Sequence, residues 1–494
     1  MIRRAAVVGV VAVSLLATGS AAPTTAGGPA SSEWACPDWG MYGRTLSRTF
    51  ATDCPSPINP RTVWRLAPAW FVDLPVPVTA SPAVVGGVVY IGAWDGVLYA
   101  LDARSGAIRW RYSTVPAPGA AFGPIVSSAA VTDVAYAGAD TRRLVIVGAG
   151  PRVVAVDATD GREVWVHDAS AGLSASPTEY EASPVVWNDL VLVGRDTHNE
   201  PGEATGGVRG GLVALDVRTG DVRWVFEPER DQPAAGCGGV WSSAAVDPEL
   251  GLAFVGTANC PDASFAWTPY TNAVVAVDLA SGEPAWSFQP SGPPDDDTDF
   301  GATPNLFVDD SGRAILGAGK KDGTYYALDR TTGALLWSTH VADPLPGVGG
   351  FIGSPAVWAG DVFGGTALGS PPYLHSLDGA TGAVRWRGGV GPTYGASAVA
   401  DGVVFNAALD LLLKAYDART GRLLWAAPLA GPASSGPVVV GDMVFIGSGT
   451  STSDLCAKDN PTDGLCVFLF DTVLASLGGI HAFRLLPAPL ELEL

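Results

Sequence analysis

The hydrophobic residues of this chain fall in short runs that are separated by turns rich in glycine, aspartate and proline. Residues 98–101 (Leu-Tyr-Ala-Leu) and 274–277 (Val-Val-Ala-Val) are two such runs, and their length and composition are typical of buried strands. The chain also contains 62 glycines and 39 prolines, which favour a turn-rich β architecture over long helices. The pattern therefore predicts an all-β protein.

A three-residue signature follows these runs seven times. It consists of an aspartate, a glycine four residues after the aspartate and a tryptophan eight residues after the aspartate. The aspartate can cap its own backbone and the glycine supplies a positive φ, so the segment between them reads as a tight turn. The tryptophan then lies on the next strand, where it can fill the same gap between neighbouring units each time. The copies are Asp102/Gly106/Trp110, Asp157/Gly161/Trp165, Asp216/Gly220/Trp224, Asp278/Gly282/Trp286, Asp329/Gly333/Trp337, Asp378/Gly382/Trp386 and Asp417/Gly421/Trp425.

Two further strands precede each signature aspartate, for example residues 80–84 and 88–92 in the first copy. Units of four short strands in series are the sequence form of a β-propeller. The C-terminal runs at 436–440, 443–447 and 481–485 have no tryptophan strand after them, whereas residues 69–72 near the N-terminus contain Trp70 and have no partners before them. Joining the two ends predicts an eighth blade, so we expect an eight-bladed β-propeller of four-stranded blades, closed by N- and C-terminal strands in one blade. We interpret all eight tryptophans as core packing.

The N-terminus has the three parts of a signal peptide: Arg3 and Arg4, an apolar run over 5–17, and small residues over 19–22. We expect cleavage near Ala22 or Ala26, and a secreted, soluble mature protein without a transmembrane segment. The predicted organisation is a signal peptide over 1–26, an N-terminal extension over 27–63, the propeller over 64–487 and a C-terminal tail over 488–494.

Export makes the six cysteines candidates for disulfides, for which 15 pairings are possible. The simplest pairing is local: Cys36–Cys54, Cys237–Cys260 and Cys456–Cys466. We expect the second bond in particular, because both of its loops open on the same face of blade four. No cysteine pair is followed by histidine in the arrangement of a c-type haem site.

The formal net charge is −20. A charge of that sign repels phosphate backbones, which excludes nucleic acid as an expected partner, and it disfavours adsorption to anionic membranes.

Candidate site residues gather on one face of the predicted ring, where the loops entering the innermost strands and those between second and third strands open. The turns between signature aspartates and glycines lie on the opposite face and vary little. Because binding residues usually lie on variable loops, function is expected on the first face, near the axis. Its polar residues cluster in blades three to five: Glu200, Glu203, Trp241, Asn259, Asp295, Asp296, Asp297, Asp299, Lys320 and Lys321.

Carboxylates with an amide carbonyl suit a hard cation such as calcium. Each residue also has a purely structural interpretation. The run from Asp295 to Asp297 can be a solvated acidic loop, Asn259 and Lys321 can belong to ordinary turns, and Trp241 can be packing at the ring axis.

At this point the chain resembles the pyrroloquinoline quinone (PQQ)-dependent alcohol dehydrogenases along nearly its whole mature length. Residues 39–44 (Trp-Gly-Met-Tyr-Gly-Arg) resemble the start of the polyvinyl-alcohol-dehydrogenase-like branch. Residues 241–248 and 254–259 are similar to that family's floor-tryptophan strand and to the strand that presents a calcium-ligating asparagine. Residues 296–300 resemble its Asp-x-Trp-Asp-aromatic segment, and residues 321–330 resemble the segment whose Lys or Arg contacts the quinone.

The resemblance implies an exported quinoprotein that oxidises an alcohol, small or polymeric, by hydride transfer to PQQ and passes electrons to an unknown acceptor. It implies Asp299 as the base, Trp241 as the floor of the quinone and Lys321 as its polar contact. It also implies calcium as Lewis acid, with Asn259, Asp299 and either Glu200 or Glu203 as ligands. Val208-Arg209-Gly210 resembles the segment after the family's ligating glutamate, in a loop of different length.

Three departures from the family pattern are visible. The chain has no adjacent Cys-Cys pair, Thr298 replaces the tryptophan of Asp-x-Trp-Asp, and Glu181 replaces a threonine before the first strand of blade three. Similar propellers also serve as scaffolds without quinone. A non-catalytic propeller that binds a protein or cell-wall partner therefore stays open, as does an enzyme that has lost its cofactor.

Overall fold

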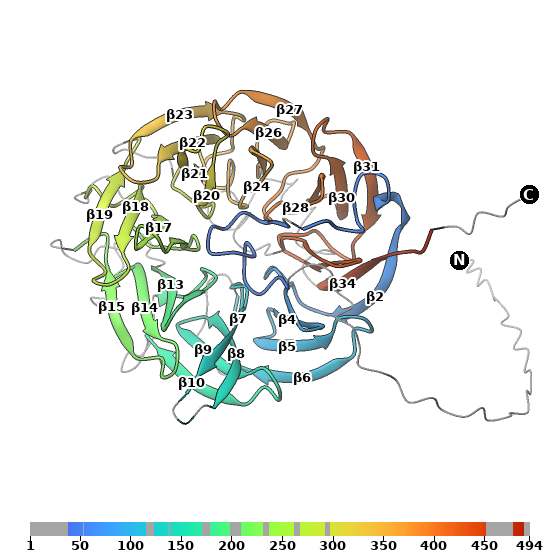
Figure 1. Ribbon diagram of the computed structural model, residues 1–494, viewed down its shortest axis with the longest axis horizontal. Coiled ribbons are helices and arrows are strands. Elements are labelled where there is room, and N and C mark those ends of the chain that lie inside the picture. The colour runs from blue at the N-terminus through green and yellow to red at the C-terminus, as the bar shows by residue number, and fades with distance from the viewer. Residues whose placement is uncertain are drawn as a thin grey trace, which may run out of the picture. The chain divides into compact units, whose positions relative to one another are not determined.

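Eight separate β-sheets, each built on four antiparallel strands, stand side by side around a ring in the computed structural model (Figure 1). The structure describes residues 38–52, 54–114, 123–136, 138, 140–169, 178–197, 209–230, 237–260, 267–291, 297–450 and 478–488, which lie in one unit that spans residues 34–494. The predicted eight-bladed propeller is therefore confirmed.

Seven blades are formed by consecutive strands, in order from the axis outward. Blade one contains β3 (Ala83–Val85), β4 (Val88–Gly92), β5 (Val97–Asp102) and β6 (Ile108–Ser113); blade two contains β7 (Ala130–Ala135), β8 (Thr141–Ala149), β9 (Arg152–Asp157) and β10 (Glu163–Asp168). Blade three contains β12 (Val185–Trp187), β13 (Leu190–Thr197), β14 (Gly211–Asp216) and β15 (Val222–Phe226), with β11 (Thr178–Glu179) paired to β13; blade four contains β16 (Ala245–Asp247), β17 (Leu252–Gly256), β18 (Val274–Asp278) and β19 (Pro284–Phe288). Blade five contains β20 (Asn305–Val308), β21 (Ala314–Gly319), β22 (Thr324–Asp329) and β23 (Leu335–His340); blade six contains β24 (Ala356–Trp358), β25 (Asp361–Gly365), β26 (Leu374–Asp378) and β27 (Val384–Gly388); blade seven contains β28 (Ala398–Ala400), β29 (Val403–Ala407), β30 (Leu412–Asp417) and β31 (Leu423–Pro428).

Blade eight closes the ring with strands from both ends of the chain. Its order is β32 (Val438–Val440), β33 (Met443–Ser448), β34 (Gly478–Leu485) and then β2 (Leu66–Leu74), which follows a short 3-10 helix at Val63–Arg65. β2 and β34 pair along their length, from Leu66 opposite Leu485 to Leu74 opposite Gly478. The predicted closure, with Trp70 on the strand from the N-terminal side, is confirmed.

The signature tryptophans join each blade to the next. Seven of the eight indoles, all but Trp425, lie against the signature glycine of the following blade: a Cβ on Gly106 would lie 2.7 Å from Trp70, and one on Gly220 would lie 2.5 Å from Trp165. Seven of the eight indoles donate Nε1–H to a main-chain carbonyl of the following blade. The acceptors are Ala103 for Trp70, Ala158 for Trp110, Val217 for Trp165, Leu279 for Trp224, Gly379 for Trp337, Ala418 for Trp386 and Leu66 for Trp425, at 2.8–3.1 Å.

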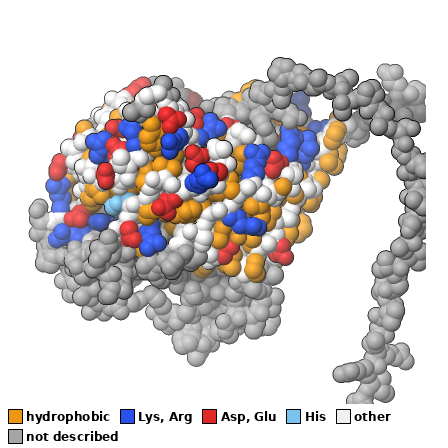
Figure 2. Space-filling view, turned by 90° about the horizontal axis from the view of Figure 1, so that it is seen from below, with side chains coloured by type: hydrophobic (Ala, Val, Ile, Leu, Met, Phe, Trp, Pro, Cys, Tyr) orange, Lys and Arg blue, Asp and Glu red, His pale blue; other side chains and the backbone are white. Residues whose placement is uncertain are grey.

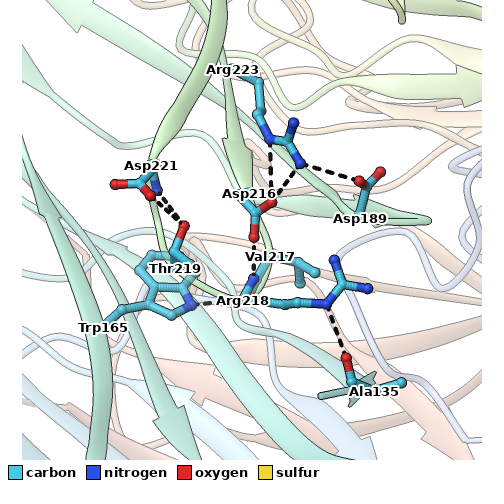
Figure 3. A network of polar contacts seen from close by, with 9 residues as sticks. All are labelled: Ala135, Trp165, Asp189, Asp216, Val217, Arg218, Thr219, Asp221 and Arg223. Atoms are coloured by element: carbon cyan, nitrogen blue, oxygen red, sulfur yellow. Dashed lines mark hydrogen bonds and ion pairs between the residues drawn. The ribbon is translucent and has the colours of Figure 1, made fainter. Parts of the chain in front are cut away.

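The turn of blade three illustrates how a signature aspartate prepares this contact (Figure 3). Asp216 Oδ1 accepts the N–H of Arg218 at 2.8 Å, and its Oδ2 accepts Arg223 Nη2 at 2.6 Å. The turn thereby holds the carbonyl of Val217 toward Trp165, whose Nε1 donates to it at 2.9 Å. Acidic and basic side chains are interspersed over the face of the molecule that Figure 2 shows.

A second set of bonds, here called the hydroxyl belt, joins the blades near the axis. It uses the residue two positions before each innermost strand, which is serine or threonine in blades one to six, Ala396 in blade seven and Gly436 in blade eight. In each step the main-chain N–H of one blade donates to the hydroxyl oxygen of the next. The steps are Gly436 to Ser81 (2.9 Å), Ser81 to Ser128 (2.9 Å), Ser128 to Ser183 (3.0 Å), Ser183 to Ser243 (2.8 Å), Ser243 to Thr303 (3.1 Å) and Thr303 to Ser354 (3.1 Å).

Residues 38–52, here called the N-terminal strap, run across the middle of the ring (Figure 1). The strap accepts a main-chain N–H from the second residue of the innermost strand in six blades, and β1 (Ala51–Thr52) pairs with β28. Arg48 is fully buried in the strap and donates to the carbonyls of Ala244 (2.7 Å) and Tyr42. Burial lowers the pKa of this guanidinium to about 9. The six donors are Val84, Val131, Val246, Leu306, Val357 and Val399.

None of the helices in the described part of the chain has the length and apolar character of a membrane span.

The closing blade contains a buried histidine that makes stability depend on pH. His481 on β34 is 8% exposed, and its Nε2 accepts the N–H of Ala430 at 3.3 Å and lies 3.0 Å from Ser448 Oγ. Burial lowers the pKa of His481 to about 4. The neutral ring is thus favoured in the folded state, while the unfolded ring binds a proton near pH 6.5.

We therefore expect stability to be full above about pH 6.5 and to fall by about 3 kcal/mol from this residue as the pH drops toward 4. His481→Gln should flatten that part of the pH profile, measured as the free energy of unfolding in urea from pH 4 to 8. His340→Gln is the matched control, since it removes an exposed imidazole and keeps the contribution of His481. A parallel profile for wild type and His481→Gln would contradict this assignment.

Candidate functional site

Trp241 occupies a ring position that recurs in every blade, four residues before the innermost strand. These positions, here called the upper ring, lie two residues before the belt residue of the same blade. Gly301 holds the position in blade five, and a Cβ there would lie 2.0 Å from Trp241 Cη2. The glycine therefore makes room for the large indole beside the axis. The upper ring consists of Thr79, Val126, Glu181, Trp241, Gly301, Ile352, Tyr394 and Ser434.

Asp299 lies between Trp241 and Lys321. Trp241 Nε1 donates to Asp299 Oδ2 at 2.9 Å, and Lys321 Nζ lies 3.2 Å from Asp299 Oδ1. The ammonium also lies 5.8 Å from the centre of the indole ring. Asp299 is 2% exposed and Lys321 is 7% exposed, and the main-chain N–H of Lys321 donates to the carbonyl of Asp299 at 2.9 Å. Three of the residues singled out in the sequence are thus brought into direct contact.

Lys321 has a second carboxylate partner in Asp297, whose Oδ1 lies 2.6 Å from Nζ. Burial acts to lower the pKa of Lys321, but the charges of Asp299 and Asp297, together with the hydrogen bond to Asp297, outweigh it and raise that pKa. The side chain therefore stays a cation. The side chain of Asp297 is 51% exposed, as expected for a solvated loop, and it also pairs with the site lysine.

The neighbouring Lys320 has a different environment. Its Nζ donates to Thr298 Oγ1 at 2.8 Å, lies 3.5 Å from Asp322 Oδ2 and stands 6.0 Å from the centre of the Phe300 ring. Thr298 is the residue that replaces the tryptophan of the family motif, and here its hydroxyl accepts a bond from a lysine that is 1% exposed.

The bond Cys237–Cys260 is present, which confirms that predicted pairing. Both cysteines are buried, and beside them the N–H of Gly238 donates to the carbonyl of Asn259 at 3.2 Å. The disulfide therefore joins the loop that leads to Trp241 to the segment that carries the half-buried Asn259. Cys54 is also disulfide-bonded, while Cys36, Cys456 and Cys466 lie outside the described residues.

The predicted calcium ligands are only partly placed. Glu200, Glu203, Asp295 and Asp296 lie outside the described residues. Among the described residues, no three or more His, Cys, Asp or Glu side chains gather into a metal-binding group. Asp299 Oδ1 is buried and accepts no hydrogen bond, although Lys321 lies near it. A buried carboxylate oxygen in that condition fits a further cation or a hydroxyl group from a ligand.

The sequence did not indicate that Gly301 accommodates Trp241 or that Glu181 lies in the same upper ring. The signal was available: a serine or threonine followed by proline or alanine recurs two residues before most innermost strands. That repeat marks the axis and would have placed both residues on one ring.

Comparison with known proteins matches residues 39–346 to the family model described as "Glucose/ethanol/alcohol dehydrogenase, beta-propeller domain". Residues 372–465 match a second model, described as "Outer membrane protein assembly factor BamB". Quinohemoprotein alcohol dehydrogenase ADH-IIG of Pseudomonas putida is 30% identical over 341 residues, which cover 60% of this chain and 45% of that protein. The chain thus spans about half the length of such relatives.

Polyvinylalcohol dehydrogenase of a Pseudomonas species is 27% identical over 488 residues, covering 83% of this chain and 73% of that protein. Among solved structures, quinohemoprotein alcohol dehydrogenase from Comamonas testosteroni superposes with a TM-score of 0.70 at 21% identity, covering 92% of this chain and 82% of that one. This structural likeness supports the fold alone.

The disulfide beside Asn259 generates a prediction about stability. The double variant Cys237→Ser/Cys260→Ser loses a cross-link between residues that are 23 positions apart. The chain-entropy model gives a loss of about 3 kcal/mol for such a loop. The free energy of unfolding in urea without reductant measures it, and the double variant avoids a free thiol that could pair elsewhere. An unchanged free energy would show that the bond does not constrain the unfolded chain.

Proposed function

Because the chain belongs to the family of glucose/ethanol/alcohol dehydrogenase β-propeller domains, we propose that it is an exported quinoprotein that oxidises an alcohol. The observation that carries the proposal is the buried carboxylate of Asp299. It is held by the indole N–H of Trp241 and by Lys321, and one of its oxygens accepts no hydrogen bond. An acceptor in this condition is suited to take a proton from a substrate hydroxyl.

The residues around Asp299 support this chemistry. Lys321 forms ion pairs with both Asp297 and Asp299, so a positive charge lies directly beside the proposed base. The indole of Trp241 offers a flat apolar surface on which an aromatic cofactor can stack, and its edge fixes the orientation of Asp299. When bound, PQQ supplies the two-electron oxidant, and calcium supplies a Lewis acid.

The same residues would hold those groups. Trp241 and Lys321 would bind the quinone, and Asn259 and Asp299 would ligate calcium together with Glu200 or Glu203. Lys321 also places positive charge where negative charge develops during alcohol oxidation. The alcohol is small or polymeric, and the electron acceptor is a separate molecule. The likeness to alcohol dehydrogenases and to a polyvinylalcohol dehydrogenase supports this range of substrates.

A second candidate is a scaffold without catalysis, and one observation favours it. Residues 372–465 match the model of an outer-membrane assembly factor. That match lies outside blades three to five, which hold Trp241, Asp299 and Lys321. Binding of PQQ to the purified full chain with calcium, followed by absorbance, separates the two candidates, because a scaffold has no use for the quinone.

Asp299→Asn tests the proposed base. The amide keeps the shape of the carboxylate but cannot accept the proton, so we expect alcohol oxidation in the reconstituted protein to fall about 100- to 10,000-fold. Dye reduction by an alcohol series measures the rate, and absorbance measures the bound quinone, which should change little because Trp241 and Lys321 remain.

Asp310→Asn is the matched control, since Asp310 is an exposed aspartate on the hairpin between β20 and β21. It should keep the wild-type rate. Full activity of Asp299→Asn would exclude Asp299 as the base, and a wild type that binds no quinone would leave the scaffold as the function.

A further inference from the structure

The ammonium of Lys321 stands between two carboxylates and bonds to the one that is not the proposed base. Its Nζ donates to Asp297 Oδ1 at 2.6 Å. The same Nζ lies 3.2 Å from Asp299 Oδ1, close enough for an ion pair, yet that oxygen accepts no hydrogen bond. The hydrogen bond of the lysine therefore goes to Asp297, and the lone pairs of Asp299 Oδ1 are left for another donor.

The main chain around Lys321 is held in place by three hydrogen bonds. The N–H of Lys321 donates to the carbonyl of Asp299 at 2.9 Å, and the carbonyl of Lys320 accepts the N–H of Gly323 at 3.1 Å and that of Phe351 at 3.0 Å. These bonds fix where the side chain starts. A lysine side chain is a flexible four-carbon stem, so the place of its ammonium is decided by the carboxylate that holds it.

Asp297 lies on the accessible side of this arrangement. Its side chain is half exposed, whereas Asp299 and Lys321 are buried. Its backbone has a φ of +56°, a left-handed conformation that aspartate, asparagine and glycine adopt more readily than other residues. Gly347, between β23 and β24, approaches its second oxygen, since a Cβ there would lie 3.0 Å from Asp297 Oδ2. One oxygen of Asp297 thus meets the lysine and the other meets the segment that leads into blade six.

We propose that Asp297 is a positioning residue that acts through Lys321, a role that rests on the proposed function of Asp299 as the base. By accepting the hydrogen bond of the ammonium, Asp297 keeps the positive charge beside Asp299 without occupying the oxygen that takes the substrate proton. A carboxylate oxygen already bonded to a lysine is a poorer acceptor for a substrate hydroxyl. The sequence motif does not reveal this role, because residue 297 stands at the variable position of Asp-x-Trp-Asp.

Removing the carboxylate of Asp297 should move the hydrogen bond. The remaining carboxylate within reach of Lys321 Nζ is then that of Asp299, and a charge-assisted bond to Asp299 Oδ1 should form. The base has to give up that bond before it can accept a proton. Because this cost falls on the chemical step, kcat and kcat/KM for the alcohol should fall together, by about 10- to 100-fold.

Asp297→Gly is the main variant, since glycine adopts a positive φ without strain and has no acceptor to offer. Asp297→Asn keeps an acceptor oxygen and tolerates the same backbone, so it should retain most of the wild-type kcat. Asp401→Gly is the matched control, because Asp401 also has a positive φ, of +40°, but lies on the hairpin between β28 and β29 in blade seven. Dye reduction gives kcat and KM in the reconstituted protein, with each rate divided by the bound quinone measured by absorbance.

The second measurement needs no quinone. In a crystal structure of quinone-free Asp297→Gly, Lys321 Nζ should lie about 2.7 to 2.9 Å from Asp299 Oδ1 with hydrogen-bond geometry. In Asp297→Asn the ammonium should stay on residue 297.

A wild-type kcat in Asp297→Gly would overturn the proposal, and so would an ammonium that forms no bond to Asp299 in that variant. Movement of the ammonium onto Asp299 in a protein whose wild type binds no quinone would uphold the effect of Asp297 on Lys321 while removing the proposed function. The two failures are therefore distinguishable.

Discussion

The contact between a signature tryptophan and the turn of the next blade holds this ring together. A buried indole needs an acceptor for its N–H and a flat surface for its face. The following blade supplies both from one turn: the carbonyl of the residue after the signature aspartate, and the bare face of the signature glycine. Gly161 and Gly220, with φ of +74° each, can take this conformation without strain because they have no Cβ. Aspartate, glycine and tryptophan therefore recur together in sequence although each contact joins two blades. Two tryptophans differ. The indole of Trp286 lies on Gly333 but its buried Nε1 has no hydrogen-bond partner, and Trp425 donates to Leu66 of β2 because blade eight has no signature turn.

Regular spacing of the blades fixes where each axial side chain stands, and the site uses that regularity. The upper ring gives every blade one residue at the same height, and most of these residues are small or aliphatic. Trp241 departs from this pattern, and Gly301 in the next blade accommodates it. Asp299 lies two residues before Gly301, so the segment that makes room for the indole also brings a carboxylate to its edge. The geometry of the site is therefore a property of two adjacent blades held in register.

Much of this was open to prediction. The signature located seven blades, and the unpaired strands at the two ends predicted the eighth with Trp70. Trp241, Asp299 and Lys321 were placed together because loop positions in a propeller follow from strand order. Contacts made by side chains could not be read in the same way. Asp297 had no feature that distinguished a solvated loop residue from the partner of Lys321. The hydroxyl belt depends on bonds between residues far apart in the sequence, such as Ser81 with Ser128 at 47 positions and Ser128 with Ser183 at 55 positions. The pairing of Cys237 with Cys260 was predictable from shared loops, whereas the environment of Glu181 required the whole ring.

The hydrogen bonds of the hydroxyl belt share one direction around the ring and leave one gap in the circle. All six steps run in one direction, from an N–H to the hydroxyl of the following blade, and they stop at Ala396 and Gly436, which have no hydroxyl to offer. The junctions between blades six and seven and between blades seven and eight therefore lack the belt bond that the other six junctions have. A chain rearranged so that its termini open between these two blades would sacrifice no hydroxyl step. The strands of the ring instead begin and end inside blade eight, next to one of these junctions, and the pairing of β2 with β34 completes that blade.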